Sequence, residues 1–275
     1  MSSAFRHIAF LCCLALAPFL TPFAQESQND WDTYVTSPNG KTPVSVMVNL
    51  GLSAKAPQRQ RPFVIIIRTK LLFPDAQGQP DKEESVSLDS IENQLDRSLY
   101  LHAGAIYAGR FTQRGIREFY FYALDTLDYI ESVAQVMLSQ GGRQWLCQAK
   151  NDREWTNYFQ VLYPSPVDLE RLQDRRLVDL LRKKGDALKE ARPIDHYFYF
   201  RTKSTRESFL HDQRLTGFNI LEMPDQPGDG DLPYLLHIKK TEIPDYHFIE
   251  HTLIPLWELA RKTGGRYDGW ETYAL

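Results

Sequence analysis

The chain has 275 residues, of which 43% are hydrophobic and 24% are charged, a composition that excludes a wholly disordered polypeptide. Thirty-two Lys and Arg residues against 35 Asp and Glu residues give a formal net charge of -3, which indicates no general affinity for nucleic acids or anionic membranes. The length allows two ordinary domains.

The first 24 residues have the layout of a secretory signal peptide. Arg6 supplies a basic start, residues 8–20 form an uncharged apolar run, and Ala24 precedes a polar segment. We expect cleavage after Ala24 and a periplasmic or secreted product without a stable membrane anchor; retention of the segment as an anchor is the alternative. After cleavage Cys147 is the only cysteine, which excludes an intramolecular disulfide.

Residues 25–165 are predicted to form an N-terminal α+β domain. Asp89, with Glu92 three residues later, forms a capping box that predicts a helix start. The expected elements are, in chain order, strands at 42–52 and 63–67, a helix from Asp89, strands at 104–112 and 116–124, a helix at 127–139 and a strand at 144–149.

Residues 166–192 are predicted to form an amphipathic linker helix. Ser165 and Asp168 form a capping box, Pro166 occupies the first helical position, and leucines recur along one face as far as about residue 191. Acidic residues offset the basic ones, which favours a helix that joins two domains over an arm that binds nucleic acid.

Residues 193–275 repeat the plan of the first domain more compactly. The expected elements are strands at 193–200, 218–223, 234–240 and 267–270, with helices at 204–217 and 245–263. The order βαββαβ is the ferredoxin-like arrangement, and the first domain shows it from Phe63 to Ala149. The sequence therefore predicts an α+β protein of two ferredoxin-like domains, related by a diverged duplication.

Three segments of the C-terminal domain resemble the regulator of ribonuclease activity B family. The segments are Pro193–Phe200, Leu215–Phe218 and Gly264–Glu271, of which the ending Tyr-Asp-Gly-Trp-Glu is the most specific. Residues 30–165 resemble a bacterial family of unknown function, number 695, that is often joined to this domain.

The resemblance implies a ferredoxin-like fold and a non-catalytic protein. Characterised members of the regulator family are cytoplasmic and bind and restrain ribonuclease E. The apparent signal peptide of this chain would separate it from any cytoplasmic nuclease. We therefore expect the fold of the family to apply here and its target not to apply.

The segment from His247 to His251 matches the H-x-x-E-H pattern of inverted zinc peptidases, with Glu250 as the general base. The apolar residues of the same helix lie on its other side and turn both histidines toward solvent, and Pro255 should bend the helix next to them. We interpret the pattern as an exposed polar face and expect no metal and no cofactor. A zinc-dependent hydrolase that uses His247, Glu250 and His251 is the alternative.

The aromatic strand Tyr197–Phe200 has the side-chain type that base-stacking RNA modules use. Basic residues and glycines do not accompany it, and alternation places two of its rings on each face of a sheet. We therefore expect core or interdomain packing here and no nucleic-acid partner.

The strand near the C-terminus is the predicted partner-binding site. Tyr267, Asp268, Trp270 and Glu271 follow a double-glycine helix stop and should lie at a sheet edge, where backbone groups are free to pair with a partner strand. Tyr267 and Trp270 would supply the aromatic area that binding sites favour. The alternative is that Trp270 closes the core under the last helix.

These patterns predict a non-enzymatic protein of the bacterial envelope that binds or modulates an unidentified protein partner. No nucleotide-binding or serine-hydrolase motif is present, and no residue is predicted to be catalytic. Two alternatives remain: a cytoplasmic inhibitor of ribonuclease E, if the N-terminus is not an export signal, and the zinc-dependent hydrolase.

Overall fold

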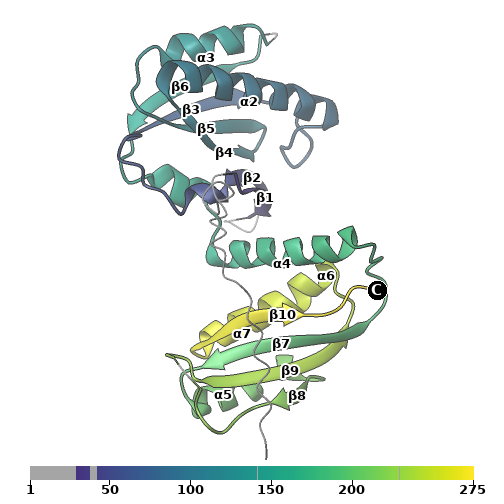
Figure 1. Ribbon diagram of the computed structural model, residues 1–275. Helices are drawn as coiled ribbons and strands as arrows, with labels where there is room; N and C mark the ends of the chain where they lie inside the picture. The colour runs from purple at the N-terminus through teal and green to yellow at the C-terminus, as the bar shows by residue number, and fades with distance from the viewer. Residues whose placement is uncertain (1–28, 38–41, 141, 229) are drawn as a thin grey trace, which may run out of the picture.

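The computed structural model describes residues 29–37, 42–140, 142–228 and 230–275, and the predicted signal peptide, residues 1–24, lies outside them. Figure 1 shows two units, each made of a sheet with its helices, and one helix between the two units. Both sheets are antiparallel, so the protein has the mixed helix and strand composition that the sequence predicts.

The first sheet has six strands in the order β1-β2-β4-β5-β3-β6. They are β1 (Trp31–Thr36), β2 (Val44–Asn49), β3 (Phe63–Lys70), β4 (Ile106–Gln113), β5 (Ile116–Ala123) and β6 (Trp145–Asn151). The β-branched run of β3 lies between β5 and β6 and is buried from Val64 to Ile67, as its composition predicts. Strand β1, which pairs with β2 at the edge of the sheet, was not predicted from the sequence.

Apolar side chains cover both faces of the first sheet. One face packs against α2 (Lys82–Ala103) and α3 (Tyr129–Leu138); α2 contributes four fully buried residues at a spacing of three or four, which forms one apolar stripe. The other face packs against η1 (Leu50–Leu52), the π-helical turn η2 (Tyr158–Leu162) and Trp155, whose ring stacks on Tyr122 at 3.8 Å.

Helix α2 begins earlier than the sequence predicts. The Asp81 side chain caps it by accepting a hydrogen bond from the backbone N–H of Glu84 at 2.7 Å, so the expected start at Asp89 is wrong. The carboxylates of Asp89 and Glu92 bind Arg110 of β4 instead, at 2.8 and 2.5 Å. A contact between α2 and the sheet therefore uses the two side chains whose spacing resembles a capping box.

Helix α4 (Pro166–Lys183) lies between the two units (Figure 1). Ser165 accepts a hydrogen bond from the backbone N–H of Asp168 at 3.3 Å and Pro166 occupies the first turn, which confirms the predicted start. The predicted continuation to about residue 191 is wrong. Gly185 has a φ of 97°, a left-handed conformation that an α-helix does not contain, and the chain then turns into β7.

The second sheet has four strands in the order β10-β7-β9-β8. They are β7 (Arg192–Phe200), β8 (Asn219–Glu222), β9 (Tyr234–Glu242) and β10 (Gly265–Glu271). One face packs on α5 (Lys203–Leu210) and on the helices that precede β10. Phe198 and Phe200 of β7 are fully buried in this core and Tyr197 and Tyr199 are only half-buried, so the predicted alternation of this strand is correct.

The predicted continuous helix over 245–263 is divided into three parts. They are α6 (Tyr246–Phe248), the π-helical turn η4 (Ile249–Leu253) and α7 (Ile254–Lys262). Pro255 lies in the first turn of α7 and has no N–H to donate to the preceding turn, so the helix is interrupted next to the residue where the sequence predicts only a bend.

The two units share one topology. Strands and helices follow the order βαββαβ in each: β3-α2-β4-β5-α3-β6 in the first and β7-α5-β8-β9-α7-β10 in the second, where α6 and η4 precede α7. Counted within each unit, the strands lie in the order fourth, first, third, second, and β2 and β1 extend the first sheet beyond its second strand. A duplicated domain requires this agreement of strand order.

Candidate protein-binding site

The predicted partner-binding residues lie on β10, an edge strand of the second sheet. A bulge interrupts its pairing with β7 between Tyr267 and Gly269, so Asp268 has no pairing partner on that strand. The side chains of Asp268 and Glu271 are exposed, whereas those of Tyr267 and Trp270 are 7% and 9% exposed. The four residues thus divide into two acids at the surface and two aromatic rings in the core.

The buried ring of Trp270 contacts two helices. It lies edge-on to Phe248 of α6 at 5.3 Å, and its indole N–H donates a hydrogen bond to Asp174 Oδ1 of α4 at 2.8 Å. Tyr267 is buried beside it and forms a hydrogen bond with His196 Nδ1 at 2.9 Å. Both rings therefore help to hold β10 on the domain core.

A hollow of about 410 Å³ lies between β10 and α4, and we call it the acidic hollow. Its lining includes four carboxylates, those of Glu170 and Asp174 from α4 and those of Asp268 and Glu271 from β10. It also includes the rings of Tyr197, Tyr267 and Trp270. All four of the predicted partner-binding residues thus line one hollow, together with acids that the sequence analysis did not single out.

Asp174 is the most buried carboxylate of the acidic hollow, with 4% exposure. Burial raises its pKa to about 7; the hydrogen bond from Trp270 opposes this shift, and the negative charges of Glu170 and Glu250 add to it. One sequence signal could have revealed this residue. Asp174 lies four residues before Val178 and seven before Leu181, on the apolar face of α4, where an unpaired acid is unusual.

The predicted metal candidates His247, Glu250 and His251 have exposed side chains. The two imidazole rings stack at 3.6 Å, and His251 Nδ1 lies 3.0 Å from the backbone oxygen of His247. The Glu250 carboxylate accepts hydrogen bonds from Arg171 Nε of α4 at 3.0 and 3.1 Å. Within the described residues, no group of three or more His, Cys, Asp or Glu side chains is arranged to hold a metal ion.

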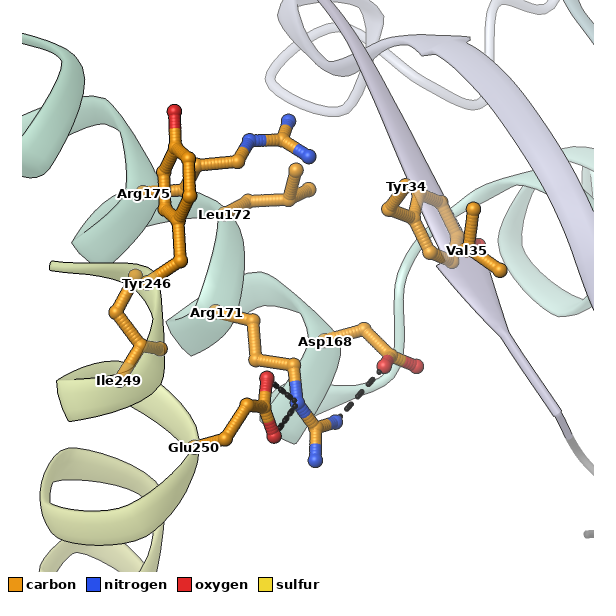
Figure 2. A pocket seen from close by; sticks show the side chains of 9 residues that line it. All are labelled: Tyr34, Val35, Asp168, Arg171, Leu172, Arg175, Tyr246, Ile249 and Glu250. Carbon is orange, nitrogen blue, oxygen red and sulfur yellow. Dashed lines mark hydrogen bonds and ion pairs between the residues drawn. The ribbon is translucent and has the colours of Figure 1, made fainter.

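Figure 2 shows that Arg171 lies in a second hollow, of about 290 Å³, where β1, α4 and α6 meet. Its guanidinium lies between Glu250 and Asp168, whose Oδ1 atom accepts from Nη1 at 3.1 Å. Tyr34 and Val35 of β1 form the opposite wall. Glu250, the general base of the zinc-peptidase pattern, therefore belongs to an ion-pair cluster between the two units.

Cys147 lies half-buried on β6, the other edge strand of the first sheet. Burial raises the pKa of its thiol, which keeps the sulfur protonated at neutral pH and makes it a poor nucleophile. Within the described residues, no helix is both long and apolar enough to cross a membrane.

Comparison with known proteins yields a family match for each unit. Residues 29–163 match the model of a family of unknown function (DUF695), and residues 171–272 match the model of the family regulator of ribonuclease activity B. No curated protein matches the chain. Among solved structures, the crystal structure of an unknown protein from Galdieria sulphuraria is 12% identical, with a TM-score of 0.22 over 77% of this chain and 98% of that chain. The N-terminal domain of this chain thus resembles DUF695, and its C-terminal domain resembles the regulator of ribonuclease activity B family.

Proposed function

We propose that this chain is a non-enzymatic protein of the bacterial envelope that binds and modulates a protein partner. The observation that carries the proposal is the match of residues 171–272, which include β10 and most of α4, to a family of regulators. The other matched family has no known function, and neither family description names a reaction. The acidic hollow, which α4 and β10 form together, lies within the matched residues except for Glu170, one position before them.

We further propose that each unit has the ferredoxin-like fold, with residues 25–165 and 193–275 as the domains and 166–192 as the linker between them. The βαββαβ order and the shared strand order support this proposal. An experimental structure with another strand order in either unit would contradict it.

The envelope location rests on the sequence alone, on the basic start at Arg6, the apolar run over 8–20 and the small residue Ala24.

A specific observation favours a second function. The matched family is described as a regulator of ribonuclease activity. If residues 1–24 are not an export signal, the protein stays in the cytoplasm and can inhibit ribonuclease E there.

Cell fractionation followed by N-terminal sequencing of the purified protein tests the location. We expect the mature chain in the envelope fraction, beginning at Gln25, and a variant that lacks residues 2–24 in the cytosol. An intact Met1 on a cytosolic protein would contradict the envelope proposal and favour the cytoplasmic inhibitor.

Affinity capture after crosslinking in intact cells tests the binding function. We expect the full chain to recover a defined envelope protein that the cytosolic variant without residues 2–24 does not recover. Recovery of ribonuclease E by both forms would support the second function. Failure of both forms to recover any specific protein would contradict the binding function itself.

A further inference from the structure

We propose that the acidic hollow binds the guanidinium group of an arginine side chain that an extended segment of the partner protein carries. This inference rests on the proposed protein-binding function and adds the chemistry that the site recognises.

The charge of the hollow favours a cation. Four carboxylates line it, and no Lys or Arg side chain is present among the described residues of its lining. One nearby base, Arg266, pairs with Asp268 at 3.0 Å and also lies over the ring of Tyr199. This leaves Glu170, Asp174 and Glu271 without a basic partner in the described part of the chain. The negative charges of Glu170 and Glu271, and that of Asp174 above its pKa of about 7, attract a positive group.

Asp174 provides an independent indication of a missing ligand. Its Oδ1 atom accepts the indole hydrogen bond of Trp270, but its Oδ2 atom is buried and has no hydrogen-bond partner among the described residues. A buried carboxylate oxygen without a donor is costly, and most such atoms in native proteins are paired. A donor that enters the hollow would remove this cost.

The lining of the hollow favours arginine over lysine. The guanidinium is planar and presents several N–H donors in a fixed fork, so one group can donate to more than one carboxylate of the lining. It is also less strongly hydrated than an ammonium group and stacks on aromatic rings, and the half-buried Tyr197 supplies ring surface to the lining.

The position of the hollow favours a polypeptide as the carrier. β10 pairs only with β7 within the described part of its sheet, so one of its two edges has no strand beside it. An extended segment that lies along this edge can pair with the backbone groups that β10 presents there, and it can place one side chain in the hollow.

Nuclear magnetic resonance of the mature full chain tests the inference through the Trp270 indole N–H signal, since this group donates to Asp174. The probes are two capped pentapeptides, Gly-Gly-Arg-Gly-Gly and the same peptide with neutral citrulline in place of arginine. We expect the arginine peptide to shift the signal with saturation in the millimolar range and the citrulline peptide to leave it unchanged. Arginine amide, which lacks the flanking backbone, should bind more weakly than the arginine peptide.

Binding is measured above the Asp174 pKa of about 7, where this side chain is charged. The variant Asp174→Asn then keeps an acceptor for Trp270 and removes the charge, and Glu271→Gln removes a charge at the surface. We expect each variant to bind the arginine peptide about tenfold more weakly, the loss typical of one charge-assisted hydrogen bond. Glu207→Gln, an equal charge change at an exposed position of α5, should bind as the parent does.

Three results would overturn the inference: no shift with the arginine peptide, an equal shift with the citrulline peptide, or equal binding by the parent and both hollow variants. Arginine amide that binds as tightly as the peptide would contradict the polypeptide carrier and indicate a small cation instead.

Capture of the partner by Asp174→Asn and Glu271→Gln at the parent level would exclude the hollow and leave the protein-binding function intact. Binding of the arginine peptide without capture of any partner would contradict the function alone.

Discussion

Trp270 has two roles at the level of single residues, one in the core and one in the acidic hollow. Its ring packs on Phe248 in the core of the second domain, and its indole N–H holds the carboxylate of Asp174. Trp270 is only 9% exposed, so most of its surface packs inside the domain and little of it is available to a partner. This low exposure favours the alternative that Trp270 closes the core, and it disfavours direct contact of the ring with a partner.

We predict that Trp270→Ala lowers the free energy of unfolding of the C-terminal domain by roughly 3–5 kcal/mol, the cost of removing a buried tryptophan ring. Urea denaturation of the full chain measures the change, and Tyr273→Ala, at an exposed position two residues beyond the end of β10, is the matched control. Near-normal stability of Trp270→Ala together with weaker partner capture would reverse the interpretation and make the ring a binding residue.

At the level of elements, a buried ion pair anchors the start of α2. Glu84 accepts hydrogen bonds from the backbone N–H groups of Leu72 and Phe73 at 2.6 and 2.9 Å and from Arg143 Nη1 at 2.6 Å. Both charged side chains of the pair are nearly fully buried. Burial by itself would raise the pKa of Glu84, but these three hydrogen bonds hold it below its usual value.

We predict that Glu84→Gln destabilises the N-terminal domain by roughly 3–5 kcal/mol at pH 7, because it leaves the charge of Arg143 buried without a partner. The pKa of Glu84 is lower in the folded protein than in the unfolded chain. The stabilisation by its ionised carboxylate is therefore complete when the pH is above the unfolded pKa, and it is lost as the pH falls through the folded pKa. The free energies of unfolding of Glu84→Gln and of the parent should thus become equal at acid pH.

Denaturation at several pH values measures this dependence. Glu83→Gln, the same change at the exposed neighbouring position of α2, should cost little at any pH. A constant difference between Glu84→Gln and the parent from neutral to acid pH would contradict the ion-pair explanation.

At the level of the whole molecule, α4 connects the two domains through packing and charge. Leu172 is buried in a core of the first domain, whereas Val178 is buried in the core of the second. Arg176 pairs with Asp30 and with Asp32 of β1, each at 2.7 Å, and Arg175 also pairs with Asp32. The joining helix that the sequence predicts is therefore shared by both domains, and it is not a free tether.

We predict that the double variant Arg175→Ala, Arg176→Ala lowers the free energy of unfolding of the N-terminal domain by about 1 kcal/mol at low salt, the range for half-exposed ion pairs. The difference should largely disappear in about 1 M NaCl, where charges are screened within about 3 Å. Lys183→Ala, Lys184→Ala removes two exposed charges near the end of the same helix and is the control. A loss that persists in high salt would indicate that packing of the arginine stems, not charge, joins the domains.

Local patterns in the sequence were sufficient to predict most of the elements and their order. A β-branched apolar run predicts β3, alternation predicts the two faces of β7, and Ser165 and Pro166 mark the start of α4, because strand pleats and helix caps depend on residues a few positions apart. The short motif at the C-terminus similarly carries the resemblance to the regulator family that the family comparison finds.

Only the tertiary structure showed which charged groups are buried and what they contact. Asp89 has the sequence of a helix cap, yet the helix begins at Lys82 and Asp89 binds Arg110, a residue of β4. Asp174 and Trp270 are 96 residues apart in the chain, and folding brings them together in one hydrogen bond. Such pairs depend on how sheets and helices pack, and long-range packing has no period along the sequence. The sequence therefore determined most of the elements and their order, and the tertiary structure decided where the buried charges meet and formed the acidic hollow.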